Sequence, residues 1–130
     1  LSGTPNISVG TIASGNITST GDIADSKGDV RRVPQVSQTS QYTLQGSDAG
    51  KHISITSGGI IVPSGIFVAG MAVSVYNNSG SDQTITQGSS TTLRLVGKSD
   101  TGNRTLAQRG LCTILCVASN EFVITGGGLT

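Results

Sequence analysis

The densest apolar run of the chain, residues 111–117, is followed by a second short apolar run, residues 122–124, across the tripeptide Ala118-Ser119-Asn120. Two apolar runs separated by a short turn-forming segment predict a β-hairpin. Because the longer run is apolar at successive positions, we expect it to be a central strand of the domain. One face of that strand would pack on the core, and the other would meet a neighbouring subunit.

Several upstream segments alternate apolar and polar residues, which is the pattern of a strand with one buried face. Turn-forming clusters separate these segments every eight to twelve residues or so. The inward residues expected from the alternation are Ile53 and Ile55 in residues 52–56, Met71, Val73 and Val75 in residues 71–76, and Leu93 and Leu95 in residues 92–96.

The composition contains too few helix-forming residues for a long amphipathic helix. The chain has 130 residues, of which 19 are Gly and only one is Glu. Such a chain favours strands and turns over helices. We therefore expect an all-β fold: an antiparallel, jelly-roll-like β-sandwich head over residues 39–130.

The first 38 residues differ from the rest by a short repeat in which a glycine is followed two residues later by isoleucine. The three copies are Gly10-Thr11-Ile12, Gly15-Asn16-Ile17 and Gly21-Asp22-Ile23. One isoleucine in every five or six residues cannot be buried by a single extended chain, but three intertwined chains could bury it. We expect residues 1–38 to form an extended trimeric stalk that leads into the head; a flexible Gly/Ser/Thr linker is the alternative.

Charge and aromatic content argue against two classes of partner. The formal net charge is +1, and the basic residues are scattered, so no nucleic-acid-binding surface is expected. The chain has two Phe, two Tyr and no Trp, which is poor material for stacking bases. No apolar run approaches the roughly 18 residues of a membrane span, so no membrane insertion is expected.

Cys112 and Cys116 are the only cysteines. On a strand they share a face but lie about 13 Å apart, which is beyond the reach of a disulfide. We expect reduced core cysteines, which suggest assembly in a cytoplasm; an inter-chain bridge or a metal site is the alternative.

No catalytic, cofactor-binding or metal-binding residue is predicted. His52 is the only histidine and falls on the polar side of its strand, and Glu121 stands alone at the hairpin tip. The spacing of Asp22, Asp25 and Asp29 does not follow a calcium loop, so we interpret them as part of a solvated turn.

Two further patterns have weak functional readings. The ending Gly126-Gly127-Gly128 lacks the Lys and the following helix of a phosphate-binding loop, which leaves a flexible or tightly packed terminus. Tyr76, Asn77 and Asn78 with Arg94 could bind a sugar through an aromatic face and polar groups. The preferred interpretation makes Tyr76 a half-buried strand residue and the two asparagines turn formers.

Several phrases resemble the C-terminal parts of fibre-type structural proteins of tailed bacteriophages. They are VYNNSG, ITQGSSTTLRL, GNRTLAQRGL and SNEFVITG, together with GNITSTGDIADSKGDVRRVPQ near the start. The resemblance implies a non-enzymatic virion structural protein, assembled in the bacterial host cytoplasm, that forms a homotrimer and contacts other virion structural proteins. A host-cell surface glycan would be its partner in host attachment.

Three other functions remain open at this stage. They are a carbohydrate-binding module, a polysaccharide-degrading tailspike fragment, and a capsid decoration protein that strengthens the shell. Detectable depolymerisation of a polysaccharide by the purified protein would contradict the non-enzymatic interpretation.

Overall fold

The computed structural model describes residue 15 and residues 18–130. Within these residues the fold is all-β, with one short 3₁₀ turn, η1 (Gly46–Asp48), and no α-helix. In chain order the strands are β1 (Ala24–Asp25), β2 (Gly28–Asp29), β3 (Gln35–Gln38), β4 (Tyr42–Thr43), β5 (His52–Ile55), β6 (Ile60–Val62), β7 (Ala72–Asn77), β8 (Gln83–Gln87), β9 (Thr92–Leu95), β10 (Arg104–Ala118) and β11 (Glu121–Leu129).

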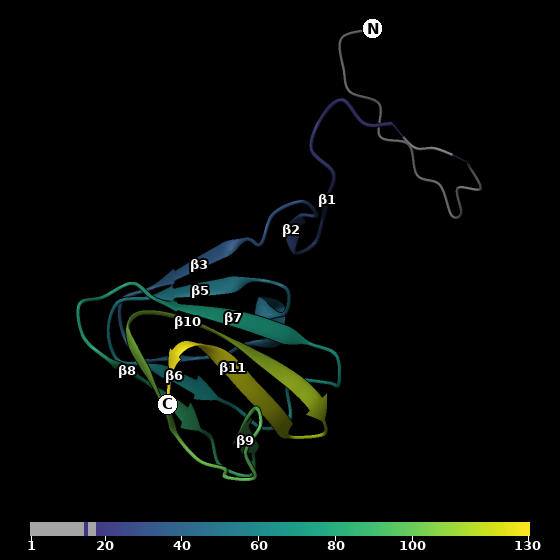
Figure 1. Ribbon diagram of the computed structural model, residues 1–130. Coiled ribbons are helices and arrows are strands. Elements are labelled where there is room, and N and C mark those ends of the chain that lie inside the picture. Colours follow the sequence, from purple (N-terminus) through teal and green to yellow (C-terminus); the bar gives the residue numbers. More distant parts are fainter. Residues whose placement is uncertain (1–14, 16–17) are drawn as a thin grey trace, which may run out of the picture.

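Between β3 and β8 the chain alternates between two parallel ladders. β3, β5 and β7 form one ladder, and β4, β6 and β8 form the other. Each connection therefore crosses from one ladder to the other, so strands that are neighbours in sequence do not pair. Figure 1 shows β3, β5 and β7 side by side, with β6 and β8 across the core from them.

The long strand β10 joins the two ladders into one sheet. Residues 104–106 pair antiparallel with β8, and residues 111–115 pair antiparallel with β7. β11 folds back along β10 as the second strand of the terminal hairpin, and β9 lies parallel to β11. The order β3-β5-β7-β10-β8-β6-β4 describes a sheet that curls into a nearly closed barrel (Figure 1).

A bulge in β10 allows it to change ladders. Leu106 faces Leu129 and Leu111 faces Gly127, so four residues on β10 are matched by a single residue on β11 between these pairs. Arg109 adopts φ 60° inside the bulge, a left-handed conformation that is uncommon outside glycine. Bulges bend a strand and increase its twist, which is what turning the corner of the barrel requires.

The buried side chain of Asn77 satisfies the carbonyl groups that the bulge leaves unpaired. Its Nδ2 donates to the carbonyl oxygens of Leu106 at 3.0 Å and Ala107 at 2.9 Å, and a third contact of 2.8 Å reaches the Ser81 oxygen. Asn77 is 0% exposed. Since a buried carbonyl without a partner costs about 1–3 kcal/mol, this one amide stabilises the corner of the sheet.

The core fills the space inside the curled sheet, and alternation determines which side chains enter it. Ile53, Ile55, Val73 and Val75 are buried, as the sequence predicts, and Leu93 is buried while Leu95 is half-buried. Phe67 and Phe122 meet edge to face, with ring centroids 5.8 Å apart. The other buried apolar residues are Leu44, Ile60, Val62, Ile85, Leu106, Cys112, Ile114, Cys116 and Ile124.

The all-β class and the terminal hairpin are confirmed, but the predicted antiparallel, jelly-roll-like sandwich is wrong in its strand pairing. Five of the eight pairings in the main sheet are parallel. The physical reason is that the turn clusters connect strands across the core instead of closing hairpins. Only β10 and β11 form a hairpin within that sheet.

Residues 1–14, 16 and 17 of the stalk proposed for residues 1–38 lie outside the described residues, and the stalk stays a prediction, as does a boundary at residue 38. Within the described part, β1 and β2 form a two-residue antiparallel pair, and Ile23 is 39% exposed. β3, at the end of the proposed stalk segment, pairs with β5 in the main sheet.

We expect Asn77→Asp to lower the free energy of unfolding by about 3–5 kcal/mol. The substitution replaces a donor with an acceptor that faces the buried Leu106 and Ala107 carbonyls. Thermal and urea denaturation would measure the loss. Asn78→Asp is the matched control: Asn78 is exposed and its Oδ1 already accepts from Arg109 Nη1, so its stability should change by less than about 0.5 kcal/mol. Equal effects of the two variants would contradict the role given to Asn77.

The glycine-rich ending is tightly packed in β11, which predicts different effects at neighbouring glycines. A Cβ on Gly126 would overlap the backbone of Leu111 and Cys112, whereas one on Gly127 would meet nothing within 4 Å. Gly126→Ala should destabilise the protein by about 1–3 kcal/mol in denaturant titrations, and Gly127→Ala should be close to neutral. A neutral Gly126→Ala variant would show that the hairpin is not packed in this way.

Candidate functional site

A groove crosses the outer face of the ladder that contains β5, β7 and the second half of β10. Its lining residues are Val33, His52, Ser74, Tyr76 and Leu111, and its volume is about 350 Å³. That volume lies at the lower end of the range for small-molecule sites. No Asp, Glu, Lys or Arg lines it, so its surface combines apolar walls with neutral polar groups.

Strand register brings the groove residues together from distant parts of the sequence. His52 faces Ser74 in the parallel pair β5–β7, and Tyr76 faces Leu111 in the antiparallel pair β7–β10. His52, Ser74, Tyr76 and Leu111 point away from the core because their strand neighbours Ile53, Val75 and Cys112 point into it. Leu111 is 53% exposed, an unusual position for a large aliphatic side chain in the middle of a sheet.

Hydrogen bonds fix the polar groups of the groove. His52 Nδ1 lies 3.2 Å from the Val33 carbonyl oxygen, and Nε2 lies 3.1 Å from Gln35 Oε1. The hydroxyls of Ser74 and Thr113 are hydrogen-bonded at 3.1 Å. The histidine ring and the serine hydroxyl are therefore held in place by the strands beside them. Both ring nitrogens of His52 lie within hydrogen-bond distance of oxygen atoms, and these contacts orient the ring within the groove.

The sugar-binding cluster suggested by the sequence is divided by the fold. Tyr76 is half-buried in the groove, as preferred above, but Asn77 is buried under the bulge of β10 and Asn78 pairs with Arg109. Tyr76 on β7 lies level with Leu111 on β10 and Gly127 on β11. Arg94 on β9 faces Val123, which lies four residues from Gly127 along β11, and β9 lies two strands beyond β10. Strand spacing and rise then separate Tyr76 and Arg94 by on the order of 20 Å.

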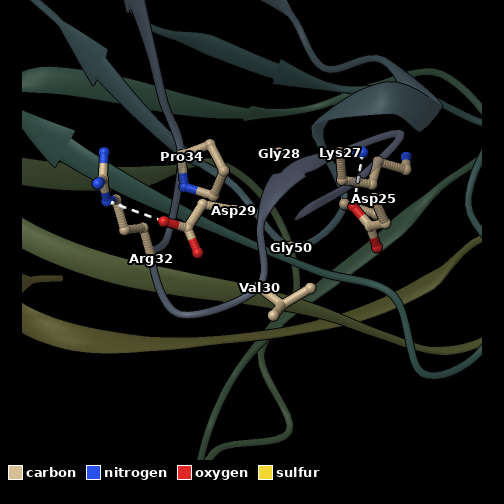
Figure 2. A pocket seen from close by; sticks show the side chains of 9 residues that line it. Asp25, Lys27, Gly28, Asp29, Val30, Arg32, Pro34 and Gly50 are labelled. Atoms are coloured by element: carbon tan, nitrogen blue, oxygen red, sulfur yellow. Dashed lines mark hydrogen bonds and ion pairs between the residues drawn. The ribbon is translucent and has the colours of Figure 1, made fainter. Parts of the chain in front are cut away.

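A second pocket, of about 280 Å³, lies where the β1–β2 hairpin meets Pro34 and Gly50 (Figure 2). Local contacts engage both of its carboxylates. Asp25 Oδ1 accepts from the Lys27 amide at 2.7 Å, and Asp29 Oδ2 lies 3.1 Å from Arg32 Nε. Figure 2 shows both contacts as dashed lines at the rim of the pocket. The aspartates thus serve as turn residues that bond local backbone and side chains.

A buried carboxylate holds the segment between β4 and β5. Asp48 is 2% exposed; it accepts from the Tyr42 hydroxyl at 3.0 Å and the Gln45 amide at 2.7 Å. Burial, together with the hydrogen bond and negative charge of Asp48, raises the pKa of Tyr42 to about 12. The three groups close a loop at one end of the barrel and are part of the scaffold.

Both cysteines are free and point into the core on β10. The prediction of reduced core cysteines is therefore confirmed for this subunit. Burial raises the pKa of the Cys112 thiol to about 12 and raises the pKa of Cys116 as well. The thiols remain protonated and unreactive near neutral pH, since the thiolate is the nucleophile.

Glu121 is exposed at the start of β11. Among the described residues, no group of three or more His, Cys, Asp or Glu side chains is arranged to hold a metal ion. Nor does the described part of the chain contain a helix long and apolar enough to cross a membrane.

Comparison with known proteins adds no relative: the chain matches no family model, no curated protein and no solved structure. The all-β class and the groove are thus the features on which function must be argued.

Sequence reasoning missed Val33, Ser74 and Leu111 as members of one site. Leu111 carried a signal, because its apolar side chain falls on the outward phase of β10 once Cys112 and Ile114 are placed inward. Its pairing with Tyr76 depends on the strand order, for which the local sequence holds no signal.

The buried thiols predict a specific reactivity. Neither Cys112 nor Cys116 should react with Ellman's reagent in the native protein at pH 8, because burial keeps both protonated, and both should react once the protein is unfolded in guanidinium chloride. Thr125→Cys, at an exposed position of the same hairpin, should react rapidly in the native state. Fast native labelling of the wild type would contradict the packing of β10.

Proposed function

We propose that the chain is a non-enzymatic structural protein of a tailed-bacteriophage virion, of the fibre type, that works as a homotrimer in host attachment. The resemblance of residues 16–130 to fibre-type proteins motivates the proposal. The structural observation that supports it most directly is an exposed apolar patch on the central strand of the sheet.

The patch consists of Leu115 and Val117 on β10 and Val123 on β11. Leu115 is 36% and Val117 43% exposed, and Val123 is half-buried opposite Leu115. A central strand normally hides its aliphatic residues under another layer, so their exposure in one subunit favours burial in an assembly. Covering Leu115 and Val117 completely would contribute roughly 1–2 kcal/mol for each side chain.

The charge distribution around the patch supports the same assembly. The outward neighbours of the patch are Thr113 on β10 and Thr125 on β11, which are uncharged, and two charged residues at its edge. Arg94 on β9 pairs with Val123, and Glu121 at the start of β11 pairs with Ala118. An apolar centre with a charged rim is typical of protein interfaces.

A trimer that projects from a virion also suits attachment by weak contacts. Three heads presented together, in many copies per particle, raise the effective concentration of each binding site. Modest affinity at each head then suffices for stable attachment.

The proposal predicts that the patch is buried in the trimer. Native mass spectrometry at micromolar concentration should give a trimer for the wild type and mainly monomer for Leu115→Asp, because each copy would bury an unpaired carboxylate. Thr84→Asp changes an exposed residue on β8, in the other ladder and away from both the patch and the proposed stalk, and should leave the trimer intact.

A monomeric wild type would contradict the proposed fibre assembly. A trimeric Leu115→Asp variant with native circular dichroism would show that another surface holds the subunits together. Antibodies against the head should label projecting appendages of intact particles by electron microscopy, and labelling of the smooth capsid surface would favour a decoration protein.

A further inference from the structure

We propose that the groove between Val33 and Leu111 is a binding site for a neutral pyranose sugar. This inference rests on the proposed attachment function and specifies the site and the class of ligand. It commits to a sugar because the groove combines three features that sugars match: the absence of charge, an aromatic and aliphatic wall, and a fixed polar floor.

The walls fit the apolar face of a pyranose ring. Tyr76 and Leu111 are direct cross-strand neighbours on β7 and β10, and their side chains form one end of the groove. A pyranose presents axial C–H groups on one face, and aromatic side chains cover such surfaces at low entropic cost because they have only two rotatable bonds. Val33 supplies a second apolar wall at the other end.

The floor fits the hydroxyl groups of the sugar. His52 and Ser74 lie side by side on β5 and β7, and Thr113 extends the same row onto β10. The Ser74 and Thr113 hydroxyls can each donate and accept, which matches sugar hydroxyls, while the His52 ring, whose nitrogens contact Val33 and Gln35, lies beside them. Since His52 is held by Val33 and Gln35, and Ser74 by Thr113, little side-chain entropy is lost on binding.

The same polar floor argues against a second protein copy as the occupant. Aliphatic side chains from a partner would cover the Ser74 and Thr113 hydroxyls without replacing their remaining hydrogen bonds to water, at a cost of about 1–3 kcal/mol for each group. The patch proposed as the subunit interface is centred on Leu115, four residues from Leu111 and therefore about 13 Å away along β10. The groove can thus stay open while the patch is buried.

The absence of charge selects among sugars. Acidic sugars such as uronic or sialic acids are usually held by Arg or Lys, and neither lines the groove. Burying a carboxylate there without a partner would be unfavourable. Neutral hexoses and N-acetylhexosamines are accordingly the expected ligands.

The test uses the full 130-residue chain, labelled with ¹⁵N, and titrates it with methyl glycosides of glucose, galactose, mannose and N-acetylglucosamine. Methyl glucuronide serves as the charged probe. We expect at least one neutral glycoside to shift the amide signals of His52, Ser74, Tyr76 and Leu111 with millimolar affinity. Methyl glucuronide should bind at least tenfold more weakly than the corresponding glucoside.

Variants locate the site. Tyr76→Ala should weaken binding at least tenfold by removing the wall, whereas Tyr76→Phe keeps the ring and should change affinity by less than about threefold. Thr125→Ala is the matched control, because Thr125 lies in the same row of the outer face but two strands away from Ser74. It should bind as the wild type does.

Leu111→Ser provides a second test if Tyr76→Ala fails to fold, since Leu111 is already 53% exposed. It too should weaken binding at least tenfold. With a Kd of a few millimolar, a glycoside at about 50 mM lies roughly tenfold above the Kd and should nearly saturate the site. The proposal is overturned if no neutral glycoside shifts the groove signals at that concentration. It is equally overturned if sugar binding survives both Tyr76→Ala and Leu111→Ser. The same holds if Tyr76→Ala changes the mass of the oligomer in native mass spectrometry but leaves sugar binding unchanged.

These outcomes are separable from the fibre proposal. A trimer that binds no neutral glycoside overturns the sugar site and leaves the proposed assembly in place. A monomer that binds glycosides through Tyr76 supports the groove and contradicts the fibre assembly.

Discussion

The Asn77 side chain and the bulge of β10 are the contact on which the rest of the sheet depends. β10 is the only strand that pairs with both ladders, and it can do so only by bending between residues 106 and 111. Bending removes the Leu106 and Ala107 carbonyls from regular pairing in a place that water does not reach easily. The Asn77 amide replaces those partners from the end of the neighbouring strand β7. One polar side chain thereby allows a single strand to close a hydrophobic core from two sides.

The two parallel ladders explain why β10 must close the core. A chain that crosses the core at every turn stacks its strands in one direction and leaves the last strand of each ladder unpaired along one edge. Here those last strands are β7 and β8, and the two halves of β10 pair with them. β11 and β9 then extend the sheet beyond β10. The terminal hairpin, which is the densest apolar part of the sequence, thus completes the structure that the earlier strands begin.

The sequence predicted the features that depend on local pattern. Alternation placed Ile53, Ile55, Val73 and Val75 on the core side, and the two apolar runs around Asn120 predicted the β10–β11 hairpin. Strand pairing was not predictable in this way. A strand in which apolar and polar residues alternate has the same sequence pattern whether it pairs in a hairpin or in a parallel ladder. The local sequence therefore does not distinguish the antiparallel sandwich from the parallel ladders that the structure contains. Asn77 was interpreted as a turn former for the same reason, because the sequence does not show the carbonyl groups that it meets.

The outer face of the sheet follows from the same register that builds the core. Cys112, Ile114 and Cys116 occupy the inward phase of β10, so Leu111, Leu115 and Val117 must point outward. A strand that only closed the core would carry polar residues on that phase, as Thr113 does. In the proposed assembly and sugar site, the outward leucines serve binding in addition to folding. Thr113, hydrogen-bonded to Ser74, stands between them and divides the face into an end beside Tyr76 and an end beside Val123. The polar row suits a ligand with hydroxyl groups, and the aliphatic end suits another subunit. A single strand can thus present two different surfaces about 13 Å apart without changing the packing of its inner face.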